Sequence, residues 1–169
     1  MNVREPTTET SSPDSPARFL IVTVGGRYLA LDAECIVGLL TLEETGNVDD
    51  PTIHGVVYSA ITLTDRLGLS NDRSGTHTRI VLLSDRDARG NVRVAAVQGR
   101  LELQPSQVLP LPMQFRGPER HWYRGMILYD NRVALVLNTT WLLDAQVSGS
   151  DIGRKQQHTS RDVESVRVQ

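Results

Sequence analysis

Short apolar runs separated by turn residues dominate the middle of the chain. The first run, residues 19–24, is apolar at both odd and even positions, which is typical of a strand buried on both faces. Gly25 and Gly26 follow it, and a glycine pair between two apolar runs supplies the positive φ angles of a tight hairpin. Asp130 and Asn131 predict a second hairpin turn. This pattern favours an all-β fold, a barrel or a sandwich, of many short strands.

Two short helices are predicted among these strands. One covers residues 62–68, with Thr62 as its cap and Gly68 as its end, and the other begins at Asn138. Three prolines in residues 101–112 indicate a connector or an edge rather than a central strand. Beyond the first run, strands are predicted at residues 28–31, 35–42, 55–61, 79–83, 92–97, 123–129 and 132–137.

A weak internal repeat links the two predicted helices. Residues 53–57 resemble residues 123–127, and each stretch leads to a cap residue. The cap follows His54 by eight residues and Arg124 by fourteen. Two related small barrels would explain the repeat, and chance similarity between short strands is the alternative.

Charge and composition divide the chain into a folded region and two tails. Residues 1–17 and 145–169 are mostly polar and are predicted to be disordered, around one folded domain at residues 18–144. Basic and acidic residues number 18 and 20, for a net charge of −2, so no basic surplus exists to neutralise nucleic-acid phosphates. We expect neither a signal peptide nor a membrane span. The single cysteine, Cys35, favours a reducing compartment and a cytoplasmic protein.

No catalytic motif emerges from the sequence. Cys35 falls in a predicted strand, where a small buried thiol is the expected interpretation rather than a nucleophile. The four histidines are far apart and have no metal-ligand spacing with Cys35. The acidic residues at 43–50 predict a solvated loop. We therefore expect no enzyme activity, no metal site and no cofactor.

The order and spacing of four stretches resemble the CheW-like domain, the coupling adaptor of bacterial chemosensory systems. The stretches are residues 19–31, residues 53–69, residues 94–110 and residues 123–143. The resemblance implies two intertwined SH3-like five-stranded β-barrels with a hydrophobic groove between them and no active site. It also implies two partners: the regulatory domain of a CheA-type histidine kinase and the cytoplasmic tip of a methyl-accepting chemoreceptor. The protein would then be recruited to membrane receptor arrays without inserting into the membrane.

Carrying the family pattern over residue by residue marks four positions of the receptor-facing groove. These are Ile36, His54, Val97 and Arg100. Ile36 and Val97 are equally compatible with plain core positions, and His54 with a solvated edge. The receptor-facing groove is therefore a hypothesis, and the structure shows where these four residues lie.

The chain also departs from the family pattern. His54 stands where the family usually has arginine, and Ala95 and Asn138 stand at aspartate positions. Thr62 likewise replaces an aspartate, but it and Asn138 remain good caps. The changes at His54 and Ala95 remove charged partners, which predicts a retained fold with an altered set of partners.

Three other functions stay open at the level of sequence. A divergent accessory adaptor would bind only one of the two partners, in pilus-driven, gliding or another chemosensory pathway. An enzyme would use Cys35 or a histidine. A small-barrel nucleic-acid binder would use one basic and aromatic cluster: Arg116, Arg120, His121, Trp122, Tyr123 and Arg124.

Overall fold

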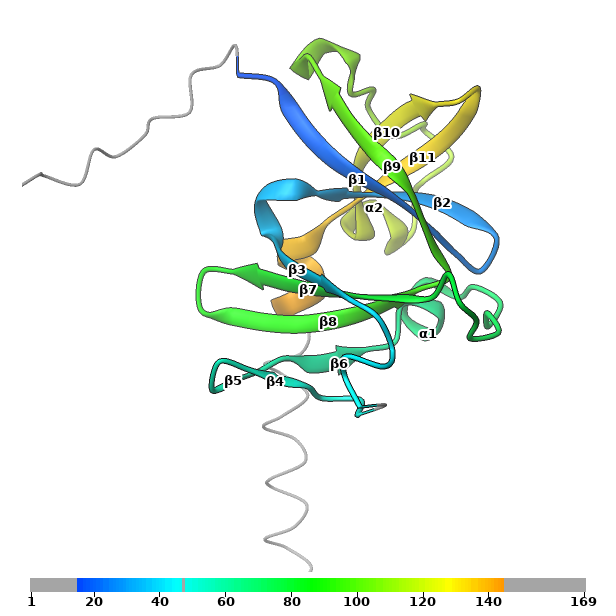
Figure 1. Ribbon diagram of the computed structural model, residues 1–169. Coiled ribbons are helices and arrows are strands. Elements are labelled where there is room, and N and C mark those ends of the chain that lie inside the picture. The colour runs from blue at the N-terminus through cyan, green and yellow to red at the C-terminus, as the bar shows by residue number, and fades with distance from the viewer. Residues whose placement is uncertain (1–14, 47, 145–169) are drawn as a thin grey trace, which may run out of the picture.

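The computed structural model of the chain describes residues 15–46 and 48–144, and strands are its main regular secondary structure (Figure 1). The first strand begins at Ala17, the last residue of the predicted N-terminal tail, and residues 1–14 and 145–169 of the predicted tails lie outside the described residues. Two main sheets and one small hairpin account for all the strands described. No helix in the described ranges is long and apolar enough to cross a lipid bilayer.

One sheet has five strands in the order β10–β11–β2–β1–β9. Neighbouring strands in this sheet are antiparallel except for β11 and β2, which run parallel. The strands come from both ends of the described chain, because β1 and β2 precede the other sheet in sequence whereas β9 to β11 follow it. Their bounds are β1 Ala17–Val24, β2 Arg27–Asp32, β9 Ala96–Leu103, β10 Tyr123–Tyr129 and β11 Arg132–Leu137.

The other sheet has four strands in the order β3–β7–β8–β6, and β4 and β5 form a separate hairpin. Here β6 and β8 are the parallel pair. All of these strands lie between β2 and β9 in sequence, so the four-stranded sheet is an insertion in the five-stranded one. Their bounds are β3 Ile36–Leu40, β4 Thr52–Ile53, β5 Val56–Val57, β6 Ser59–Ile61, β7 Arg79–Asp85 and β8 Ala88–Val94.

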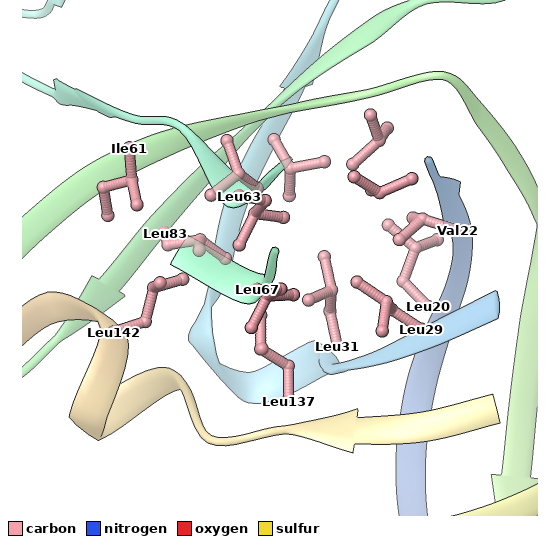
Figure 2. Packing of buried hydrophobic residues seen from close by; sticks show 14 of the residues in the cluster. Leu20, Val22, Leu29, Leu31, Ile61, Leu63, Leu67, Leu83, Leu137 and Leu142 are labelled. Atoms are coloured by element: carbon pink, nitrogen blue, oxygen red, sulfur yellow. The ribbon is translucent and has the colours of Figure 1, made fainter. Parts of the chain in front are cut away.

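Alternate residues of β1 point into two different cores. Leu20 and Val22 belong to a core that the two sheets share, where Figure 2 shows them packed with leucines from both sheets. Phe19 and Ile21 belong to a second core on the opposite face of the five-stranded sheet. The apolar run at both odd and even positions is therefore buried on both faces, as the sequence predicts.

The four-stranded sheet divides its residues in the same way. On β7, Val81 and Leu83 belong to the shared core, whereas Ile80 and Leu82 belong to a third core under the β4–β5 hairpin. Each sheet thus covers a small core of its own and contributes to the shared one. The predicted all-β class with two small barrel-like units is confirmed.

The two sheets repeat one arrangement. In each, a central antiparallel hairpin has an antiparallel edge strand on one side and a parallel strand on the other, and the parallel strand runs directly into a helix. The pairing register makes residues 18–23 (Arg-Phe-Leu-Ile-Val-Thr) equivalent to residues 79–84 (Arg-Ile-Val-Leu-Leu-Ser). It also makes the caps Thr62 and Asn138 equivalent. The two units therefore repeat, but the predicted match between residues 53–57 and 123–127 is wrong, because the first stretch forms the β4–β5 hairpin and the second lies within β10. The clearest sequence match between the units lies in the central strands.

The predicted helices and turns form at their expected places. Helix α1, Leu63–Leu67, ends at Gly68, which has the left-handed conformation of a C-cap, and a second helix covers residues 139–144. The glycine pair after β1 and the pair Asp130–Asn131 all have positive φ, as tight hairpins require. A further short helix, α2 at Glu119–Trp122, precedes β10 and was not predicted.

The two helix caps differ in their hydrogen bonds. The Asn138 Oδ1 atom accepts a hydrogen bond from the Trp141 backbone N–H at 3.3 Å, and its Nδ2 donates to the His121 carbonyl at 2.9 Å. The Thr62 side chain makes no capping bond to α1, which contradicts its predicted role as a side-chain cap.

This difference predicts unequal costs of removing the two caps. Asn138→Ala should lower the free energy of unfolding by about 1–2 kcal/mol, because an N-cap bond and the link to His121 are lost. Thr62→Ala should cost less than about 0.5 kcal/mol. Urea denaturation of both variants measures the difference, and equal costs would show that the observed bonds do not set helix stability.

Three predicted strand boundaries are wrong. Residues 35–42 do not form one strand, because Cys35 ends a 3-10 turn, η1 at Ala33–Cys35, before β3 begins. The predicted strand at 55–61 is broken at Tyr58, which separates β5 from β6. The predicted strand at 92–97 spans the passage between the two sheets, which the chain makes at Ala95.

Candidate partner-binding surfaces

Ile36 and Val97 occupy equivalent positions in the two sheets. Ile36 opens edge strand β3 opposite Leu83, and Val97 lies near the start of edge strand β9 opposite Val22. Both side chains are partly buried and pack against the shared core. The structure therefore places these two predicted groove residues on one core, each at an outer edge of a sheet.

A bulge gives each edge strand a second residue on the shared-core face. In β9 the register shifts between Val97 and Gly99, so Arg100, opposite Leu20, is on the same face as Val97 although it lies three residues further on. In β3 the register shifts between Ile36 and Gly38, which brings Leu39 to the equivalent position. Arg100 and Leu39 are both exposed.

His54 lies apart from these residues. It occupies the turn between β4 and β5, is exposed, and has a φ angle of 50°. That hairpin packs on the third core rather than on the shared one. Of the four predicted groove residues, Ile36 and Val97 thus pack on one core, Arg100 is exposed on the same face of β9 as Val97, and His54 lies on a separate hairpin.

Two exposed apolar surfaces were not predicted. The first, here called the β3 surface, consists of Val37 and Leu39, which are 57% and 41% exposed. The sequence contains no signal that separates these residues from their buried neighbours, because β3 is apolar at every position apart from Gly38.

The second, here called the β10–β11 surface, consists of Leu109, Leu128 and Val133. Leu128 and Val133 pair across the hairpin and are 64% and 53% exposed. Leu109 forms an isolated antiparallel β-bridge with Met126. Met126 lies two residues before Leu128 and therefore on the same face of β10. This face continues the shared core outward, because Leu135 beside it packs against that core. Such a continuous apolar surface is typical of a protein-binding site.

A polar network closes the end of the five-stranded sheet beside α2. Arg124 donates to Asn138 Oδ1 at 3.3 Å and to Thr140 Oγ1 at 3.0 Å, and the Thr140 hydroxyl donates to Asp85 Oδ2 at 2.7 Å. Arg124 belongs to the basic and aromatic cluster that the sequence associates with nucleic-acid binding. In the structure it connects β10, the final helix and the end of β7.

The aromatic members of that cluster are divided between the core and a cleft. Tyr123 is buried in the shared core, whereas Trp122 stacks on Trp141 with ring centroids 5.9 Å apart. The two tryptophans line an open cleft of about 680 Å³ together with His121 and Arg124. None of the four predicted groove residues lines this cleft.

Cys35 is half-buried beside two carboxylates. Burial raises the pKa of its thiol, and the negative charges of Asp32 and Asp85 raise it further, against smaller opposing effects of the Arg124 charge and the Thr139 hydroxyl. A raised pKa keeps the thiol protonated at neutral pH, whereas a nucleophile needs the thiolate. The geometry favours a structural cysteine.

The raised pKa predicts slow alkylation of Cys35. At pH 7.5 the folded protein should react with iodoacetamide about tenfold more slowly than the protein unfolded in urea, since both thiolate fraction and access are lower. The rate should rise with pH until it passes the raised pKa. A folded-state rate equal to the unfolded one, measured by mass spectrometry, would contradict this prediction.

Comparisons with known proteins agree with this geometry. The family model of the CheW-like domain matches residues 18–147. Among solved structures, the scaffolding protein TtCheW from Thermoanaerobacter tengcongensis is similar, with a TM-score of 0.60 and 14% sequence identity. The match covers 73% of this chain and 89% of that one. No curated protein matches the chain by sequence.

Proposed function

The chain belongs to the CheW-like domain family, and on that basis we propose that it is a non-catalytic adaptor of a bacterial chemosensory system. It would couple the cytoplasmic tip of a chemoreceptor to the regulatory domain of a CheA-type histidine kinase. The folded region, residues 18–144, would do this in the cytoplasm, at receptor arrays on the membrane. The tails would not be needed for either contact.

One observation carries this proposal: two exposed apolar surfaces lie on different sheets. The β3 surface belongs to the four-stranded sheet and the β10–β11 surface to the five-stranded sheet. An adaptor has to bind two proteins at once, so it needs two surfaces that do not overlap. Exposed apolar side chains on a rigid sheet supply contact area at little entropic cost, because the strands are already ordered.

We assign the receptor to the β3 side. Ile36 and Val97, which pack against the shared core, lie on the two edge strands, and Arg100 is exposed on the same face of β9, with Leu39 as its counterpart on β3. An apolar centre with a charged residue at its rim suits a helical receptor tip, whose binding would be tuned at Arg100. His54 would contribute from the β4–β5 hairpin. The kinase domain would then occupy the β10–β11 surface.

The test is a binding titration of the full chain against both partners from the same organism. Isothermal calorimetry should detect both, each at about the micromolar level that small interfaces commonly give. Binding of one partner alone would make the protein an accessory adaptor, and His54→Arg should then strengthen the weaker contact if the lost arginine is the cause. If neither partner binds, the adaptor function is wrong although the fold stands.

A further inference from the structure

The tryptophan cleft beside α2 presents aromatic rings and basic groups together. Trp122 and Trp141 stack at an interplanar angle of 29°, and both are partly exposed. His121 and Arg124 line the same cleft, and Pro118 and Asp144 complete its rim. Both indoles pack against the shared core, which holds the rings in place. The cleft is therefore rigid before any ligand arrives.

The charged groups of the cleft leave donors available. Arg124 uses its Nε and Nη2 atoms for Asn138 and Thr140, which fixes the guanidinium and leaves its other donors. His121 lines the cleft, and Arg120 lies beside it in the same turn of α2. Both side chains are exposed and donate no hydrogen bond to any described residue. One carboxylate, Asp144, lines the cleft. The lining thus has two basic side chains, Arg124 and His121, and one carboxylate, which favours an acidic ligand.

Two properties of a ligand follow from this lining. Grooves lined by aromatic rings bind proline-containing segments in an extended conformation, because such segments lose little entropy on binding. An arginine held in a fixed orientation binds carboxylates through charge-assisted hydrogen bonds. The cleft therefore suits an acidic segment with several prolines.

The chain carries such a segment at its N-terminal end. Residues 1–16 contain three prolines and three carboxylates against one arginine. Residues 145–169 contain no proline, and their four basic and three acidic side chains give the opposite net charge. The composition thus distinguishes the N-terminal segment from the C-terminal one. Its prolines are Pro6, Pro13 and Pro16, and its carboxylates belong to Glu5, Glu9 and Asp14.

The register of the five-stranded sheet brings that segment to the correct end. Phe19 pairs with Asp32 at the start of β1, and the parallel pairing of β2 with β11 puts Asn138 level with Asp32. Trp122 lies at the same level as Asn138, because the Asn138 backbone N–H donates a hydrogen bond to the Trp122 carbonyl at 2.7 Å. The chain therefore enters β1 at the end of the sheet that holds the cleft. Three strand spacings of about 4.8 Å separate β1 from β10, and sixteen extended residues span about 50 Å.

We propose that residues 1–14 dock in the tryptophan cleft as an intramolecular ligand. Pro6 and Pro13 lie against the indole rings, and the carboxylates lie against Arg124 and His121, with Arg120 beside the cleft. A tether of this length gives an effective concentration of about a millimolar, so even a weak intrinsic affinity keeps the cleft occupied much of the time. The inference goes beyond the adaptor function and does not depend on which partners bind.

The test uses the two tryptophans of the chain as reporters, since both line the cleft. The full chain, labelled with ¹⁵N and carrying Cys35→Ser, receives a nitroxide at Ser11→Cys. Both indole N–H signals should lose intensity by more than about twofold relative to the reduced label, because a docked segment holds the nitroxide near the rings. Intensities unchanged by the label would overturn the proposal.

Two matched variants complete the test. A nitroxide at Ser160→Cys, in the C-terminal segment, should broaden both indole signals much less than the Ser11→Cys label does, because that segment is tethered beside Asp144 at the rim but is not bound in the cleft. If it broadens them as much as the Ser11→Cys label, or if it alone does so, the proposed occupant is wrong. Neutralising the segment with Glu5→Gln, Glu9→Gln and Asp14→Asn should restore most of the lost intensity. Undiminished broadening in that variant would contradict recognition by charge and overturn the proposal.

Discussion

Leu83→Ala is expected to lower the free energy of unfolding by about 3–5 kcal/mol, the largest stability effect of any single change considered for this chain. Leu83 is fully buried in the shared core, where Figure 2 shows it beside the leucines of α1 and of the final helix. The neighbouring side chains come from both sheets, so no single sheet can move to fill the cavity. We therefore expect both sheets to lose stability together.

Two probes measure this effect in one urea titration. Trp122 and Trp141 report on the end of the five-stranded sheet, whereas far-ultraviolet circular dichroism reports on all strands. Both transitions should move to lower urea by the same amount and stay coincident, as a single cooperative unit requires. Leu39→Ala, on the same sheet but exposed, is the matched control and should cost less than about 1 kcal/mol. A tryptophan transition that stays in place for Leu83→Ala would show that the sheets unfold separately.

The local features of the fold were predictable because local physics decides them. An apolar run such as residues 19–24 needs burial on both faces, and Gly25–Gly26 or Asp130–Asn131 can take the positive φ angles of a hairpin. The helix that Asn138 caps also follows from sequence, because its side chain bonds to the helix's own first turn. In each case the deciding contacts lie within a few residues along the chain.

The passage between the two sheets at Ala95 was not predictable in this way. Residues 92–97 are apolar apart from Arg93 and contain no turn residue, so only pairing with distant strands divides them. The Ala95 N–H donates to the Thr23 carbonyl at 2.8 Å, a contact across more than seventy positions. The bulges beside Val97 and Ile36 have the same cause, since a period of two fails wherever a strand carries an extra residue.

The candidate surfaces were only partly predictable. Family resemblance marked Ile36 and Val97, but Leu128 and Val133 have the composition of buried strand residues. Their exposure depends on the place of β10 at the edge of its sheet and on what packs there. The sequence shows that a residue is apolar. Whether its side chain is exposed depends on the assembled sheets, in which nothing in the described chain covers these residues.

Glutamate substitutions on the two surfaces should separate the two binding activities. Leu128→Glu should weaken binding of the kinase domain at least about tenfold, equal to about 1.4 kcal/mol, because a desolvated charge replaces a central apolar contact. Binding of the receptor tip should stay within about twofold of its original value. Leu39→Glu should have the reverse pattern, since it removes an apolar contact beside the groove residues. Calorimetric titration of each variant with each partner measures all four affinities.

The controls distinguish a lost contact from a damaged fold. Val48→Glu adds the same charge at an exposed residue outside both surfaces and should change neither affinity by more than about twofold. The double variant should lose both activities additively, because the two sites lie on different sheets and share no partner. If Leu128→Glu weakens both partners equally while the thermal transition is unchanged, the two proteins compete for one surface. A protein with one shared surface could not hold a receptor and a kinase at once, and the coupling function would then be excluded.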